Sequence, residues 1–518
     1  MKRILVILMT IVLTAGLCAC AGEHGQTASS GGNEETAGST GHAAADTTEA
    51  ADPGEDKPAR VLEVGFGKAC ITPTEEGIVL KGGVSRGKYD DIYAITTAFR
   101  DERGEMYIHI VVDLIAAGMA DEDKYATSLG VCDMSRKAIQ RELGIDPQNV
   151  TVSATHNHSQ VEYANTSEPN THWREYTLLP EIVRSVKDAI DDLAPAKMSI
   201  ARTRTSHLTF VRRYFLNDGT FYDGYRELRD GDVARHESDA DEEVQLVLFE
   251  REEKKSILIV NWQTHATKVS SRGDIITSDF VGSLRDKVEA ELGVHCVYYQ
   301  GACGNLAPSS RLAGEAVIPD GGWENAQKLG WAVAAYVIDA FESETFEEVE
   351  TGLVEKQRIT VLGKVKKYAA VGDELYNNAL KVIEYGKTAE NNYDTARYAA
   401  EFGIETIYHA QSIVQNAVLP ETKTYELNLI SIGDVAFANL PAEYFDTTGM
   451  QIKSGSPFKM TLIVAYSCAK GQYVASADAI PHGGYETYKT YFADGTAEIT
   501  VGYCLDTLKA LYPIRKGK

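Results

Sequence analysis

Two histidines stand at the end of a short apolar segment in the first third of the chain. His156 and His158 follow residues 150–154, whose sequence VTVSA is typical of a buried strand. Side chains two positions apart in extended backbone point to the same side, and neutral imidazole is the commonest side-chain metal ligand. The pair therefore indicates a metal ligand at one position and a ligand or a supporting partner at the other. The alternative is one structural histidine and one surface histidine.

A third histidine occupies a similar place much further along the chain. His265 follows the apolar segment 256–262, and Asp279 opens the next predicted helix. The Asp279 carboxylate either orients His265 or caps that helix. Glu443 lies where a predicted strand turns into a helix, so its carboxylate either points inward or belongs to the first helical turn.

Two further motifs are open to more than one interpretation. Arg212 and Arg213 precede a turn, and either bind a substrate oxygen or pair with surface acids. Ser85 lies in a Gly-x-Ser-x-Gly sequence, but the nucleophile elbow of serine esterases needs a strand before it and a helix after it. Residues 92–99 look like a strand instead, so a glycine-rich loop is expected at Ser85.

The composition is that of an ordinary globular chain with a strongly acidic balance. The 518 residues carry a formal net charge of −24, which argues against nucleic acid as a partner. Predicted strands and helices alternate from about residue 61 onward, which indicates an α/β fold with mixed β-sheets flanked by helices. Residues 363–417 predict a helical hairpin insertion. The cysteines form no Cys-x-x-Cys pair, and the sequence establishes no disulfide.

The N-terminus has the features of an exported lipoprotein. A positive start and a short apolar run lead to Leu-Cys-Ala-Cys, which resembles a bacterial lipobox ending at Cys20. We expect a signal peptide over residues 1–20, lipid on Cys20, and a disordered tether over 21–60 that is rich in small and acidic residues. The alternative is an ordinary secretory signal. The expected location is the extracytoplasmic face of a bacterial membrane.

Seven separate segments, taken in order, resemble the N-terminal catalytic domain of the neutral/alkaline non-lysosomal ceramidases. The resemblance implies a zinc amidase that cleaves the amide of N-acylsphingosine, in a domain covering residues 61–518. The family's zinc ligands match His156, His265, Glu443 and Tyr473, and His158 matches a histidine that lines the site. Two imidazoles and a carboxylate suit a catalytic zinc with an open position. The segments are 64–73, 155–159, 261–265, 278–280, 300–305, 440–443 and 484–486.

The sequence departs from this family at four places. The family's catalytic serine, in a Gly-Asp-x-Ser-Pro turn, is replaced by Ala307 in the sequence GNLAP. Gln160 and Val161 stand where a Gly-Pro pair is usual, and Cys70 stands where the family usually has aspartate. Because the sequence stops near residue 518, the C-terminal β-sandwich of full-length ceramidases is expected to be absent.

These observations predict a lipid-anchored zinc hydrolase that cleaves an amide or related acyl bond in a small amphipathic or lipid-like substrate. His158, Asp279 and Arg213 are the expected catalytic residues, with His158 transferring a proton or stabilising an oxyanion. One alternative is a non-catalytic binding lipoprotein that keeps the fold and the metal. A weaker alternative is a serine esterase that uses Ser85. The sequence does not indicate an oligomeric state.

Overall fold

The computed structural model describes residues 61–118, 130–222, 231–269, 273–343, 345–388, 394–468 and 472–514. The expected signal peptide, the lipid-modified Cys20 and the tether lie outside these residues. Within the described ranges, no helix combines the length and the apolar character that a membrane crossing requires.

A large mixed sheet forms the centre of the fold. Its order is β16-β14-β13-β8-β1-β5-β6-β7, and β18 (Glu347–Val349) pairs with β8 as a ninth strand. Most neighbours are antiparallel, but β6 and β7 are parallel, and so are β14 and β16. The strand bounds are β1 Glu63–Cys70, β5 Tyr93–Arg100, β6 Met106–Val112, β7 Val150–Ala154, β8 Ala194–Arg204, β13 Glu243–Arg251, β14 Ile257–Trp262 and β16 His295–Gln300.

A second, four-stranded sheet packs face to face on the first. Its order is β19 (Val354–Lys364), β20 (Thr422–Ile432), β21 (Val435–Asn439) and β23 (Met460–Val464), with β21 and β23 parallel. Buried side chains from both sheets form one apolar cluster. Stacked sheets need such alternating apolar residues on their facing sides.

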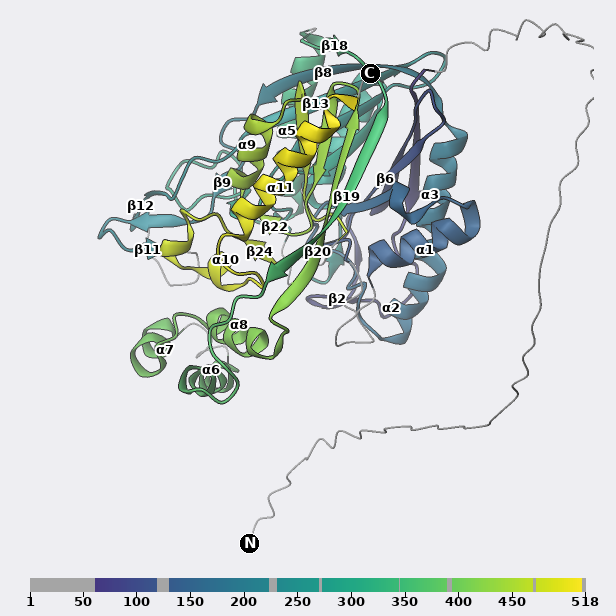
Figure 1. Cartoon of the computed structure of the whole chain (residues 1–518). Helices are drawn as coiled ribbons and strands as arrows, with labels where there is room; N and C mark the ends of the chain where they lie inside the picture. Colours follow the sequence, from purple (N-terminus) through teal and green to yellow (C-terminus); the bar gives the residue numbers. More distant parts are fainter. Residues whose placement is uncertain are drawn as a thin grey trace, which may run out of the picture. The chain divides into compact units, whose positions relative to one another are not determined.

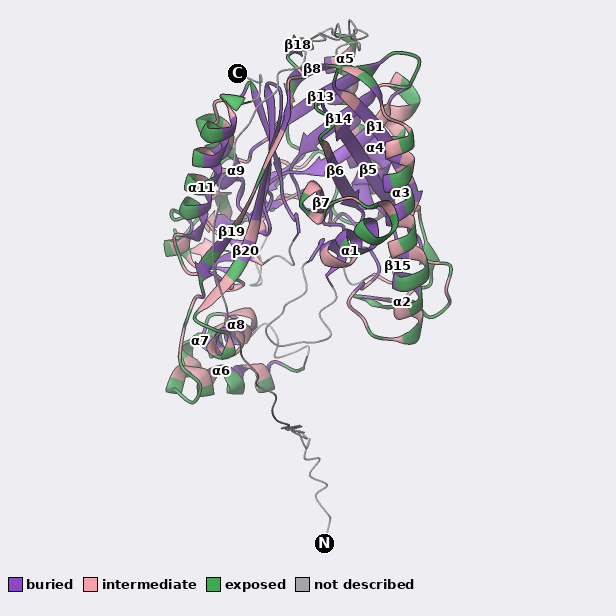
Figure 2. Ribbon diagram, turned by 45° about the vertical axis from the view of Figure 1, so that its right-hand side comes forward, coloured by how far each residue is buried: buried purple, intermediate pink, exposed green. Residues whose placement is uncertain are grey.

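Helices cover the outer faces of both sheets (Figure 1). Apolar clusters join α1 and α3 to the β1–β7 half of the large sheet, α4 and α5 to its β13–β16 half, and α9 and α11 to the second sheet. In Figure 2 the strands are largely buried and the helices expose their outer sides. The α/β fold with mixed sheets flanked by helices is therefore confirmed. The helix bounds are α1 Val131–Leu143, α3 Leu179–Asp191, α4 Asp279–Leu292, α5 Trp323–Glu342, α9 Asp446–Gly455 and α11 Thr496–Leu511.

Two glycines explain how closely β1 packs on α3. A Cβ atom at Gly65 would lie 1.9 Å from the carbonyl oxygen of Ala189, and one at Gly67 would lie 1.9 Å from that of Ser185. Any larger residue would push the helix away from the sheet, so glycine serves a packing role here.

The helical insertion lies between β19 and β20. It has three helices instead of the two of a hairpin, α6 (Glu374–Tyr385), α7 (Thr395–Phe402) and α8 (Ile407–Val418), around a small apolar core of their own. The α8 helix contacts α10 (Tyr485–Tyr488), and the Tyr408 and Tyr485 rings lie 4.9 Å apart. The expected insertion is thus present, and its helix α8 contacts α10.

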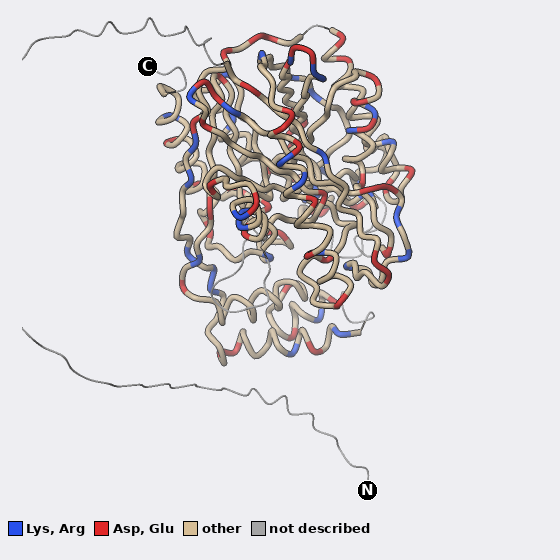
Figure 3. Tube along the Cα trace, turned by 90° about the vertical axis from the view of Figure 1, so that its right-hand side faces the viewer, with Lys and Arg blue, Asp and Glu red and all other residues tan. Residues whose placement is uncertain are grey.

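Acidic and basic positions are interspersed along the described chain (Figure 3), and some form ion pairs between layers. Arg136 on α1 pairs with Glu426 on β20 at 2.8 Å, and Arg103 pairs with Glu355 on β19 at 2.7 Å. These pairs join the helix layer and the large sheet to the second sheet.

Short elements complete the described chain. The short helices are α2 Glu168–Trp173, the π-helical turn Arg174–Leu178, and the 3₁₀ turns Pro147–Asn149 and Ile480–His482. The short strands are β2 Val79–Leu80, β3 Gly83–Val84, β4 Gly87–Lys88, β9 Phe210–Val211, β10 Tyr214–Leu216, β11 Phe221–Tyr222, β12 Val233–His236, β15 Ile275–Ile276, β17 Leu306–Ala307, β22 Glu443–Tyr444 and β24 Tyr473–Val474.

Candidate metal centre

The candidate ligands follow the carboxyl ends of strands that belong to parallel pairs. His156 comes just after β7, His265 just after β14, and Glu443 just after β21. The loops that carry the histidines are joined, since the His158 backbone N–H donates to the Ala266 carbonyl at 3.2 Å. Each candidate ligand therefore lies beyond the carboxyl end of a strand, which is where open α/β sheets build their sites.

Three side chains converge at distances that suit a zinc ion. Glu443 Oε2 lies 3.2 Å from His265 Nε2 and 3.4 Å from His156 Nε2. With zinc–ligand bonds of about 2.0–2.2 Å, neighbouring donors of a tetrahedral site lie roughly 3.3–3.6 Å apart. His158 Nε2 lies 3.1 Å from His156 Nε2, so a three-histidine set is also possible geometrically.

The surroundings of His156 fix which nitrogen faces the site. Its Nδ1 lies 2.8 Å from the carbonyl oxygen of Ile115, which can only accept a hydrogen bond. Nδ1 therefore carries the proton and Nε2 presents its lone pair, the arrangement that metal-bound histidines commonly have. The ring stacks on Tyr466, with centroids 3.9 Å apart.

His265 is held differently. Its buried Nδ1 has no hydrogen-bond partner within the described ranges, and its Nε2 lies 3.2 Å from Glu443 Oε2. Its ring also lies 4.8 Å from that of His156.

The electrostatics leave these groups in the protonation states that a metal requires. Burial, reinforced by the Arg212 charge, lowers the pKa of His265 to about 3. Burial also lowers the pKa of His158, with a contribution from His156. Burial raises the pKa of Glu443, but His156 and His265 outweigh it and hold that pKa well below its ordinary value. At neutral pH the site therefore offers neutral imidazoles at His158 and His265 and an ionised carboxylate, which fits Zn²⁺.

Tyr473 lies beside these donors. Its strand, β24, pairs in parallel with β22, so that Tyr473 is the register partner of Glu443. Its hydroxyl accepts a hydrogen bond from Arg212 Nη2 at 3.0 Å, and Arg212 also binds the Gly304 carbonyl at 3.0 Å. Arg212 is thus the arginine of the pair that reaches the candidate centre.

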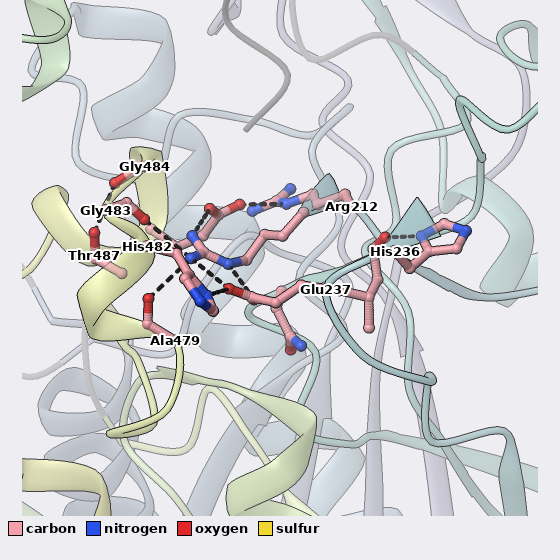
Figure 4. A network of polar contacts seen from close by, with 12 residues as sticks. Arg212, His236, Glu237, Ala479, His482, Gly483, Gly484 and Thr487 are labelled. Carbon is pink, nitrogen blue, oxygen red and sulfur yellow. Dashed lines mark hydrogen bonds and ion pairs between the residues drawn. The ribbon is translucent and has the colours of Figure 1, made fainter. Parts of the chain in front are cut away.

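Arg213 occupies a buried ion-pair network. Figure 4 shows members of this network, among them Glu237, Ala479 and Gly483. Its guanidinium donates to both Glu237 oxygens at 2.6 and 3.0 Å and to Glu486 at 3.2 Å. It also donates to the carbonyls of Ala479 and Gly483. These contacts make Arg213 an anchor for the loop before α10.

Asp279 likewise supports backbone. Its carboxylate accepts the N–H groups of Val269 and Phe280 at 2.8 Å each, and burial raises its pKa to about 6. Since Val269 lies on the loop that carries His265, this geometry favours a role in positioning that loop over direct contact with the imidazole. We therefore treat Asp279 as a positioning residue and not as a catalytic one.

The turn that contains Ala307 packs against the Glu443 strand. The Gly304 N–H donates to the Tyr444 carbonyl at 2.8 Å, and a Cβ at Gly304 would lie 2.3 Å from the Glu443 carbonyl oxygen. Ala307 itself pairs with Phe210 on β9. The nearby Ser309 hydroxyl binds Asp320 at 2.5 Å, so it does not stand in for a serine at 307.

Ser85 has the setting expected from its sequence. It lies between β3 and β4, and its hydroxyl contacts the Gly87 carbonyl at 3.2 Å. No helix follows directly, so the strand–turn–helix of a nucleophile elbow is missing at this position.

Sequence reasoning missed Tyr466 and the Ile115 carbonyl. Tyr466 follows β23 directly, so the strand-end pattern that indicated His156 and His265 applies to it as well. The Ile115 carbonyl could not be found in this way, because backbone groups leave no residue-type signal.

A two-sheet α/β sandwich with imidazole and carboxylate groups at its strand ends is the class that this fold and site define. Two solved structures share this fold. One is a ceramidase complexed with C2, with a TM-score of 0.63 and 16% identity over 88% of this chain and 76% of that chain. The other is neutral ceramidase from Pseudomonas aeruginosa, with a TM-score of 0.64 and 17% identity over 88% and 75%. The ceramidase-like fold is therefore confirmed. Neither a protein-family description nor a curated protein matches the sequence.

Proposed function

We propose that this protein is a zinc-dependent hydrolase that cleaves an amide or related acyl bond in an amphipathic substrate. The observation that carries the proposal is the convergence of His156, His265 and Glu443, with contacts of 3.2 and 3.4 Å between their donor atoms. The shared fold of two ceramidase structures supports a hydrolase of this class.

In the proposed site His156, His265 and Glu443 hold the ion, with Tyr473 beside them as the fourth candidate ligand. A zinc ion bound there supplies a Lewis acid for the acyl carbonyl and lowers the pKa of water to about 7. Tyr473 is the register partner of Glu443, its ring lies 6.4 Å from that of His265, and its hydroxyl is held by Arg212.

The remaining residues transfer a proton during the reaction or hold the site residues and their loops in position. His158 is neutral, and its Nε2 lies beside that of His156, so it can take a proton from an attacking group and return it to the leaving amine. Arg212 fixes Tyr473, Arg213 fixes the loop before α10, and Asp279 fixes the loop that carries His265.

Metal removal tests this proposal. Purified protein treated with a strong chelator should lose hydrolysis of its best substrate in a panel of N-acyl amides and esters, and added zinc should restore it. The panel should vary acyl length and head group. Zinc-loaded protein that binds the panel but cleaves no member would support the non-catalytic binding lipoprotein instead.

We also propose that the protein is exported and held at the extracytoplasmic face of a bacterial membrane by lipid on Cys20, with residues 21–60 as a tether. One acyl chain gives only marginal membrane binding, so mass spectrometry should find more than one on the mature N-terminal cysteine. A Cys20→Ala variant should be released from the membrane fraction. An unmodified N-terminus beyond Cys20 in membrane-bound protein would contradict this.

A further inference from the structure

Two buried cysteines from distant parts of the chain meet beside β7. Cys132 lies in the first turn of α1, and Cys468 lies in the loop after β23. Their sulfur atoms are 2.7 Å apart. Non-bonded carbon atoms rest at about 3.5–4.0 Å, and sulfur is larger than carbon. Both cysteines are free in the structure, and their 2.7 Å separation lies between the length of a disulfide bond, about 2.05 Å, and the contact distance of two separate sulfurs.

Hydrogen bonds to β7 hold the segments that carry both cysteines in place. The Cys468 N–H donates to the Val152 carbonyl at 2.8 Å, and its sulfur accepts the Val152 N–H at 3.4 Å. On the other side, Arg136 of α1 donates through Nε to the Val150 carbonyl at 2.9 Å. Helix α1 and the loop after β23 are thus docked on the same strand, with the two sulfurs between them.

The other cysteines of the body are placed differently. Cys303 lies 3.1 Å from the Tyr466 hydroxyl. Across the described ranges, no sulfur–sulfur contact is found for Cys70, Cys296, Cys303 or Cys504. The close pair is therefore specific to Cys132 and Cys468.

We propose that Cys132 and Cys468 form a disulfide in the mature protein. Each thiol loses its hydrogen as the Sγ–Sγ bond forms, and two electrons and two protons pass to the disulfide of an extracytoplasmic thiol oxidase, which becomes a dithiol. Both side chains are at most 1% exposed in the folded chain. The bond must therefore form as α1 docks, before the pair is closed off from the oxidase.

The bond would fasten the loop that supports His156. Tyr466, whose ring stacks on His156, lies on the loop that contains Cys468. Both Tyr466 and Cys468 have a left-handed backbone conformation, with φ of 55° and 50°. Residues other than glycine rarely adopt this conformation. A covalent link to α1 holds this unfavourable backbone in one conformation.

Peptide mapping tests the bond directly. In full-length protein that is exported to an oxidising compartment, unfolded in denaturant and alkylated without reduction, the peptides of Cys132 and Cys468 should be recovered as one linked species. Reduction should separate them, and Cys70, Cys296, Cys303 and Cys504 should be alkylated throughout. Recovery of alkylated Cys132 and Cys468 from unreduced protein would overturn the proposal.

Thermal unfolding gives a second readout that does not depend on zinc or on hydrolysis. The bond closes a very long loop, so reductant should lower the Tm of the wild type by roughly 5 °C or more. Cys132→Ser and Cys468→Ser should each lose this sensitivity to reductant, whereas Cys504→Ser should keep it. Sensitivity retained in either of the first two variants would contradict the bond, whatever becomes of the proposed function.

Discussion

Replacing His265 with alanine is expected to weaken zinc binding more than 100-fold and to abolish hydrolysis. Loss of an outer partner of a metal site typically costs about 10–100-fold in metal affinity, and His265 is a proposed direct ligand. Its Nε2 is also the atom that contacts Glu443. Titration of zinc against a competing chelator measures the change, with circular dichroism used to compare folding.

His295→Ala is the matched control. This histidine starts β16, at the opposite end of the strand pair from His265, and its ring stacks on Phe66. The control should keep the zinc affinity of the wild type. Equal zinc affinity in His265→Ala and the wild type would contradict the site.

His158 separates the two possible ligand sets. If His156, His265 and Glu443 hold the metal, His158→Ala should retain zinc and lose activity, while Glu443→Gln should lose zinc. Loss of zinc in His158→Ala, with zinc retained in Glu443→Gln, would indicate the three-histidine set.

Replacing Ala307 with serine is expected to raise ceramide hydrolysis by about 10²–10³-fold at equal zinc content. One hydrogen-bond donor at a developing oxyanion typically contributes a rate factor of about this size. The methyl group of alanine cannot donate such a hydrogen bond. The wild type should accordingly cleave ceramide weakly and prefer another acyl substrate. Steady-state assays on ceramide and on the preferred substrate measure both changes.

Ser309→Ala is the control for this substitution. Its hydroxyl is bound to Asp320, so its removal should leave ceramide hydrolysis unchanged. High ceramidase activity in the wild type would show that residue 307 does not limit the reaction. No gain in Ala307→Ser would show that a serine at this turn is insufficient.

The strand-end histidines illustrate what the sequence could predict. Apolar β-branched segments before His156 and His265 indicated both strands. Each strand pairs in parallel with a different neighbour, β7 with β6 and β14 with β16, so this pairing alone does not bring the two histidines together. The local pattern did not indicate that the strands divide into two stacked sheets. That division depends on pairings between residues far apart in the sequence, such as β8 with β13 and β19 with β20.

The two arginines show where residue types alone are insufficient. Arg212 and Arg213 are adjacent, and extended backbone sends neighbouring side chains to opposite sides. In the structure both arginines bind Glu486, but Arg212 also reaches Tyr473, whereas Arg213 is fully buried and binds Glu237. Which arginine faces the site depends on where acidic residues that are distant in the sequence lie in the folded chain. The sequence pattern around the arginines does not indicate those positions.

X-ray absorption at the zinc edge of the zinc-loaded wild type tests the central claim most directly. We expect one zinc per chain with nitrogen and oxygen neighbours at about 2.0–2.2 Å, and a reduced nitrogen contribution in His265→Ala. Protein that takes up no zinc, or zinc surrounded by sulfur, would contradict it.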